Sequence, residues 1–101
     1  MIEYSSPRDL VITAVKNAIK KTDPTLLKIL EVHLESREGK GLDMAYENPE
    51  KFVDSMRDLF GEYSGRFFEL LLIQEVKELV GFKEQPNSLK EAIEILKTYV
   101  L

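Results

Sequence analysis

Residues 66–82 read RFFELLLIQEVKELVGF, which is the most apolar run in the chain. Phe68, Leu72 and Val76 recur at the four-residue spacing of one helix face. In the first half of the run, apolar side chains also occupy the other sides of the helix, and a helix that is apolar all round is buried all round. We therefore expect a buried central helix over about 64–81, enclosed by neighbours in its first half and reaching water in its second.

Two residues mark the expected ends of this helix. Ser64 is the expected N-cap, because a serine side chain can accept a hydrogen bond from the free N–H groups of a first helical turn. A nucleophilic role for Ser64 is disfavoured, since no histidine lies near it in the sequence. Gly81 is expected to end the helix in a left-handed conformation. The run is interrupted by charge, whereas a membrane span needs about 20 mostly apolar residues, so we expect no membrane association.

Four further helices are expected around the central one, and three of them begin at a proline. Ser6, Asp23 and Asn48 each precede a proline, which is the pattern of a polar N-cap followed by proline at the first helical position. Ser88 and Glu91 form a capping-box pattern for the last helix. The expected ranges are 7–21, 24–38, 49–60, and 89 nearly to the end.

Residues 39–47 leave two conformations open. Gly39 and Gly41 frame a flexible turn, and the alternation over 42–46 fits either a short extended segment or a single helical turn. No other segment indicates a strand. We therefore predict an all-α fold, a compact bundle of about five helices that forms a single domain over 1–101.

Composition excludes several classes of protein. Hydrophobic residues make up 44% of the 101 residues, which is typical of a globular chain, and the absence of cysteine excludes disulfides and thiol chemistry. With 14 basic and 18 acidic residues the net charge is -4, which argues against general binding to nucleic acid or anionic lipid. The first 20 residues show no signal-peptide pattern, so we expect a cytoplasmic protein.

His33 is the single histidine of the sequence, so it is the main candidate for a catalytic or metal-binding role. A nucleophile–base pair or a histidine-containing metal site would have to use His33, and no partner occurs at a suitable spacing. We expect a partly buried side chain that is hydrogen-bonded to a carbonyl or a nearby acid. We therefore predict no catalytic residue, no metal site and no cofactor, and we do not expect an enzyme.

The last helix is the predicted interaction surface. Its apolar face is wider than one neighbour in a small bundle usually needs, and it follows a polar, proline-containing linker. It can therefore close its own core or pair with another chain. We favour a homodimer with an isologous interface, centred on Leu89, Ile93, Leu96 and Tyr99.

One family resemblance extends this interpretation. VHLES at 32–36 is followed by AYENPEKFVDSMRDLFGEYSGRFFELLLIQEVKEL at 45–79. This succession resembles an archaeal family described as a Nitrosopumilus-type output domain. The matching residues are His33, Leu34, Glu35, Pro49, Glu50, Phe52, Phe60, Gly61, Phe68 and Glu69. The resemblance covers about 10–80, leaves the last helix outside, and implies an all-helical archaeal module in signalling or regulation without an active site.

These observations favour a non-enzymatic interaction or regulatory module that presents a helical surface to a protein partner. The alternative is a transcription-linked regulator that contacts DNA weakly or through a partner, and a small enzyme comes third. Lys16, Lys20, Lys21 and Lys28 are the only basic cluster for DNA contact. The candidate recognition helix, 49–60, is not basic, so direct DNA binding is not the leading interpretation.

Overall fold

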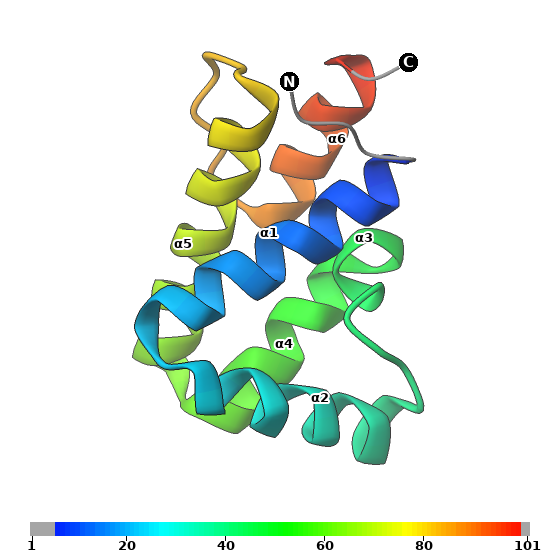
Figure 1. The fold of residues 1–101 in the computed structure, drawn as a ribbon, viewed down its shortest axis with the longest axis vertical. Coiled ribbons are helices and arrows are strands. Elements are labelled where there is room, and N and C mark those ends of the chain that lie inside the picture. Colours follow the sequence, from blue (N-terminus) through cyan, green and yellow to red (C-terminus); the bar gives the residue numbers. More distant parts are fainter. Residues whose placement is uncertain (1–5, 100–101) are drawn as a thin grey trace.

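The chain forms six α-helices and no strand over residues 6–99, which are the residues that the computed structural model describes (Figure 1). The helices are α1 (Pro7–Thr22), α2 (Pro24–Glu38), α3 (Met44–Glu47), α4 (Pro49–Phe60), α5 (Glu62–Val80) and α6 (Leu89–Tyr99). The predicted all-α class is confirmed. The additional helix, α3, is the single helical turn that was one of the two conformations open to 39–47.

The helix α5 is the element on which the others assemble. It packs against α1, α4 and α6, while α1 also contacts α2 and α3. Figure 1 shows α5 running along one side of the molecule, with α2 across one end and α6 at the other. Among the described residues, these three helices make the main contacts of α5, and part of its surface stays exposed.

The proline-marked helix starts are confirmed, because each depends on local chemistry. Ser6, Asp23 and Asn48 each accept a hydrogen bond on the side chain from a backbone N–H in the following first turn, at 3.1, 3.0 and 3.3 Å. These bonds satisfy donors that the helix itself leaves free. Proline at the first position costs nothing there, since its missing N–H would have had no helical partner.

The start of α5 differs from the prediction. The helix begins at Glu62, and Ser64 lies within its first turn rather than at the cap. Gly61, at φ 93°, ends α4 and opens α5 without an intervening loop. Its carbonyl accepts from the Gly65 N–H at 2.8 Å, which is the first backbone bond of α5, and no side chain caps this end of the helix. The predicted end is confirmed, with Gly81 left-handed at φ 88°.

A glycine allows α4 and α5 to approach closely. A Cβ built on Gly65 would lie 2.8 Å from the Cα of Arg57 on α4, a separation that real Cβ atoms do not show. The absent side chain therefore sets the distance between these helices. It also explains why a residue with low helix propensity is placed inside a long helix.

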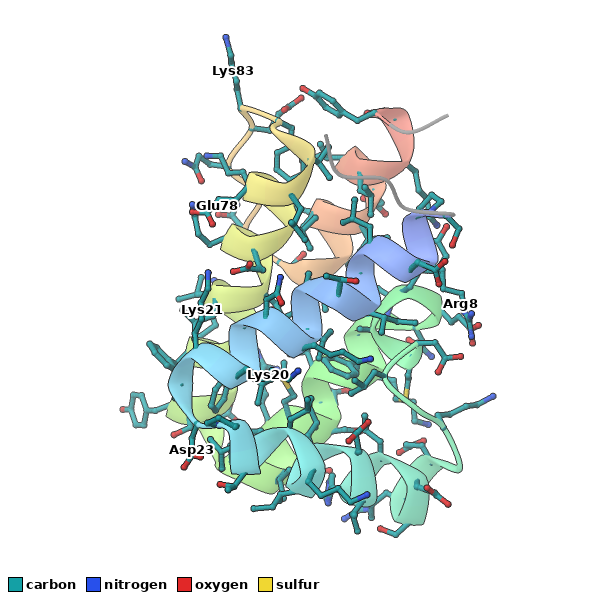
Figure 2. All side chains as sticks on the ribbon, in the orientation of Figure 1. Arg8, Lys20, Lys21, Asp23, Glu78 and Lys83 are labelled. Carbon is teal, nitrogen blue, oxygen red and sulfur yellow. The ribbon has the colours of Figure 1, made fainter. Side chains whose placement is uncertain are left out.

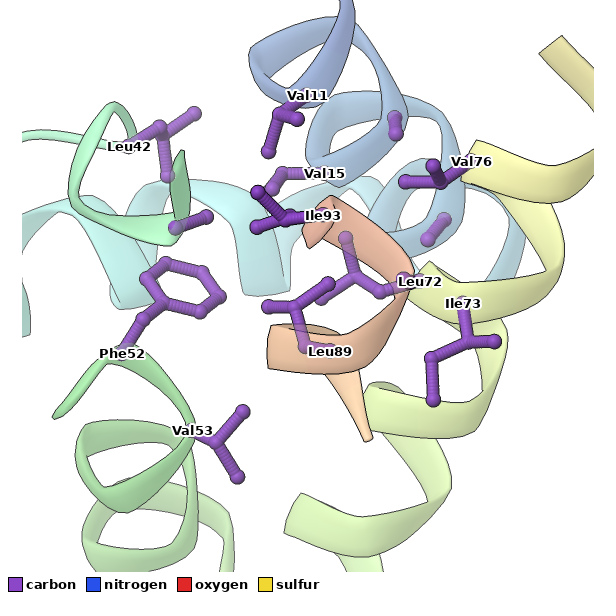
Figure 3. Packing of buried hydrophobic residues seen from close by; sticks show 14 of the residues in the cluster. Val11, Val15, Leu42, Phe52, Val53, Leu72, Ile73, Val76, Leu89 and Ile93 are labelled. Atoms are coloured by element: carbon purple, nitrogen blue, oxygen red, sulfur yellow. The ribbon is translucent and has the colours of Figure 1, made fainter. Parts of the chain in front are cut away.

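One apolar core joins the helices. Leu72 of α5 and Phe52 of α4 are both 0% exposed. Figure 3 shows these side chains in the same layer as Val15 of α1 and Ile93 of α6. The predicted stripe of the central helix is thus buried, as expected, and α6 contributes to the same core as α1, α4 and α5.

Candidate interaction surface

Burial on α6 overturns the predicted interface. Leu89, Ile93 and Leu96 are 0%, 2% and 0% exposed, because they pack into the core of their own chain. Tyr99 is 49% exposed, and its hydroxyl donates a hydrogen bond to the Glu84 carboxylate at 3.0 Å. The last helix could either close its own core or pair with another chain, and in the structure it closes its own core. Three of the four predicted interface residues are therefore absent from the surface.

A buried carboxylate fastens α6 to α5. The Glu69 side chain is 5% exposed, and its Oε2 accepts from the backbone N–H of Leu89 at 3.0 Å. Its Oε1 accepts from Arg66 Nη1 at 2.8 Å, and the same Nη1 donates to the Asn87 carbonyl at 3.0 Å. A negative charge is favourable at the start of α6, where backbone N–H groups are free. Glu69 therefore connects the side of α5 to the first residue of α6.

A second buried carboxylate fastens α5 to α1. Glu75 is 7% exposed, and its Oε2 accepts from Lys21 Nζ at 2.8 Å. This hydrogen bond raises the pKa of Lys21 above its ordinary value. Together, Glu69 and Glu75 hold α5 to two neighbours and so fix which face of α5 points outward.

The outward face of α5 carries large apolar side chains. Tyr63, Phe67 and Leu70 are 94%, 50% and 47% exposed, and they follow one another at helical spacing. Gln74 continues the same line one turn further and is also exposed. We call these four residues the α5 stripe. The expectation that the first half of the central helix is enclosed is wrong on this side, because α1, α4 and α6 leave these side chains exposed among the described residues.

A smaller apolar pair is exposed on α2. Ile29 and Val32 are 46% and 54% exposed and lie three residues apart. Both side chains are aliphatic and neither is aromatic, in contrast to the α5 stripe. They make a suitable internal comparison for experiments on that stripe.

A pocket of about 260 Å³ lies among α4, the middle of α5 and the start of α6. Its lining residues are Pro49, Glu50, Val53, Asp54, Arg57, Glu69, Ser88 and Lys90. Lys90 Nζ lies 3.9 Å from Glu50 Oε1, and Arg57 Nη1 lies 3.8 Å from Asp54 Oδ1. Since Glu69 is also bonded, the charges of this pocket are largely balanced from within. It therefore offers less for a ligand to recognise than the α5 stripe does.

His33 does not make the hydrogen bond that was expected. Its Nε2 is buried and has no hydrogen-bond partner among the described residues. Within residues 6–99, no group of three or more histidine, cysteine, aspartate or glutamate side chains is placed to hold a metal ion. None of the helices within 6–99 has the length and hydropathy to cross a membrane.

The predicted basic cluster is not one uniform patch. Lys16, Lys20 and Lys28 are exposed, whereas the charge of Lys21 is engaged by Glu75. Figure 2 shows Lys21 at the edge of α1 that lies beside α5, and Lys20 away from that edge. Over residues 6–99, the cluster therefore presents three exposed cations without an ion-pair partner, distributed over α1 and α2.

Over residues 6–99, the fold and this surface define an all-helical domain that leaves an apolar face of α5 exposed. The chain belongs to the family described as Nitrosopumilus output domain 5, whose sequence profile matches residues 5–98. The family resemblance is thus confirmed. The match includes α6, which the resemblance had left outside, and α6 packs into the same core as the other helices.

A solved structure shares this fold. The crystal structure of PH0832 from Pyrococcus horikoshii OT3 superposes with a TM-score of 0.87 and is 33% identical in sequence. The alignment covers 93% of this chain and 96% of that one. No curated protein matches the chain.

Proposed function

We propose that this chain is a non-enzymatic interaction or regulatory module of archaeal signalling or regulation, acting in the cytoplasm through the α5 stripe. A single observation carries this proposal. Tyr63, Phe67 and Leu70, all large and apolar, stand exposed in one line on the helix that organises the fold. We retain a homodimer as part of the proposal, on α5 rather than on α6.

The exposed apolar side chains of the α5 stripe are contiguous. Single exposed apolar residues are common on protein surfaces, but a continuous exposed apolar patch usually marks an interaction site. Aromatic side chains are also enriched in the energetically dominant parts of interfaces. The α5 stripe supplies two aromatic rings and a leucine on a rigid helix. The Glu69 and Glu75 side chains are 5% and 9% exposed, and they bind α5 to its neighbours α6 and α1. The stripe is therefore presented in one fixed orientation.

A comparison of capture from native cytoplasm tests the proposal. The double variant Phe67→Ser/Leu70→Ser removes the centre of the stripe, and Ile29→Ser/Val32→Ser removes a similar apolar pair from α2. We expect proteins retained by the parent chain and by the α2 variant, but not by the α5 variant. Retention of the same proteins by the α5 variant, with its circular dichroism and melting unchanged, would overturn the proposal.

A transcription-linked regulator that contacts DNA weakly or through a partner is the second candidate. The three exposed lysines Lys16, Lys20 and Lys28 support it. Retardation of a DNA fragment at physiological salt should then be lost in Lys16→Glu/Lys20→Glu, because phosphate contacts depend on these cations. If the variant retards DNA as the parent does, or if neither retards it, the second candidate fails.

A further inference from the structure

The α5 stripe has a symmetric spacing. Tyr63, Phe67, Leu70 and Gln74 are separated by four, three and four residues, so the order of intervals is the same from either end. This is the spacing of a coiled-coil seam, in which side chains of one helix insert between those of another. The two exposed apolar residues at the centre, Phe67 and Leu70, lie on either side of the midpoint.

A symmetric seam is complementary to its own copy in reverse. When two identical helices pair antiparallel about a two-fold axis through that midpoint, Phe67 of one copy lies opposite Leu70 of the other. Tyr63 then lies opposite Gln74. Each contact occurs twice, which is the property of an isologous interface.

The charges beside the stripe support the same pairing. Glu62 lies at the start of α5, with its side chain 80% exposed, and Lys77 lies close to the end of the helix. Both are on the same flank of the stripe, and an antiparallel partner brings the end of one helix beside the start of the other. The two Glu62 carboxylates would therefore each meet the Lys77 ammonium of the opposite copy.

These two groups are accessible for such a contact. Lys77 forms no salt bridge within the described residues, although Glu84 is close enough to feel its charge. Glu62 Oε1 lies 3.4 Å from Arg57 Nε without a hydrogen bond between them. Arg66, the other cation on this flank, is already held by Glu69 and by a backbone carbonyl.

We propose that the partner of the α5 stripe is a second copy of this chain, paired antiparallel through α5, with Phe67 against Leu70 at the centre and Glu62 against Lys77 at each end. This inference rests on the proposed function and names the partner of the same surface. One helix face buries less area than the roughly 800 Å² per partner of a standard interface. The dimer is therefore weak, and the fraction of chains in it rises with protein concentration.

Exchanging charges tests the pairing directly. Light scattering after size exclusion, over a dilution series, should give a mass that rises from the 11.7 kDa of one chain towards twice that value. Glu62→Lys alone and Lys77→Glu alone each place like charges opposite one another in a dimer, so each should shift dissociation to at least several-fold higher concentration. An equimolar mixture of the two variants restores opposite charges at both ends and should recover the parent behaviour.

Two further variants keep the test independent of folding. The double variant Glu62→Lys/Lys77→Glu loses the same contact with Arg57 as the single variant, yet it should dimerise as the parent does. The matched variant Ile29→Ser/Val32→Ser on α2 should also leave the dimer unchanged, whereas Phe67→Ser/Leu70→Ser should abolish it.

The outcomes separate this inference from the function on which it rests. A mass of one chain at every accessible concentration, or a mixture that associates no better than either single variant, overturns the self-pairing. If the chain is monomeric but the α5 variant alone loses captured proteins, the stripe binds another protein. The homodimer then fails, whereas the interaction module stands. If substitution of the stripe changes neither mass nor capture, both proposals fail.

Discussion

Removing the Glu69 carboxylate should weaken the attachment of α6 to α5. The change Glu69→Ala eliminates both of its hydrogen bonds, the one from the Leu89 N–H at 3.0 Å and the one from Arg66 at 2.8 Å. The two losses differ in cost because the donors differ in their access to water. Leu89 is 0% exposed, whereas the Arg66 side chain is 43% exposed.

The magnitude follows from these two environments. A buried N–H left without an acceptor costs about 1 to 3 kcal/mol. The contribution of the Arg66 pair is discounted to about 0 to 1 kcal/mol, because Arg66 keeps its contact with water and with the Asn87 carbonyl. Loss of one buried methylene adds about 0.8 kcal/mol. We therefore expect Glu69→Ala to lower the free energy of unfolding by about 2 to 5 kcal/mol.

Two comparison variants sharpen this expectation. Glu69→Gln keeps one acceptor oxygen and the side-chain volume, so it should lose less than Glu69→Ala. Glu94→Ala removes an exposed glutamate of α6 and should change stability by less than about 0.5 kcal/mol. All three are compared by urea denaturation at one protein concentration, so that any contribution from self-association is held constant.

Amide hydrogen exchange locates the effect within the molecule. In Glu69→Ala, exchange of the Leu89 N–H should accelerate more than exchange of the N–H groups in the middle of α1. The reasoning is refuted if Glu69→Ala unfolds within about 0.5 kcal/mol of the parent, since a buried donor cannot lose its acceptor at no cost.

Four other outcomes follow from the structure. Leu72→Ala should lower stability by about 2 to 5 kcal/mol through lost burial and a cavity, measured by urea denaturation, and an unchanged midpoint would contradict its central place. Gly65→Ala should destabilise by about 1 to 3 kcal/mol in the same assay, because overpacking at the α4–α5 contact exceeds the gain in helix propensity; a stabilised variant would show that the helices can separate freely. His33→Leu should match the parent or exceed it in thermal melting, since it removes a buried nitrogen that has no partner, and a large loss would reveal a bond at that nitrogen. The Arg8 hydrogen bond lowers the pKa of Asp43 below 3.8, so the ionised carboxylate stabilises the fold above that pH. Asp43→Asn should therefore be less stable than the parent at pH 7, and the difference in stability should vanish as the pH falls through the lowered pKa. A difference that does not depend on pH would exclude the ion pair as its cause.

The sequence by itself determined where most helices begin and end. Ser6, Asp23 and Asn48 could be recognised as N-caps because a cap bonds to N–H groups two or three residues away, so its chemistry is contained in the local sequence. Gly81 could be recognised as a terminator for the same reason. The family pattern was also readable, since its residues recur in order along the chain.

Only the tertiary structure decided which apolar faces were covered. The sequence marks Phe67 and Leu70 as apolar in the same way as Leu72, and Leu89 in the same way as Tyr99. Whether each is buried depends on how many helices pack around α5 and on how far each is rotated. Those quantities are set by long-range contacts such as the bond from Leu89 to Glu69, twenty residues apart, and by the close approach at Gly65. A helical pattern specifies a face of a helix, but its burial depends on neighbours brought from distant parts of the chain.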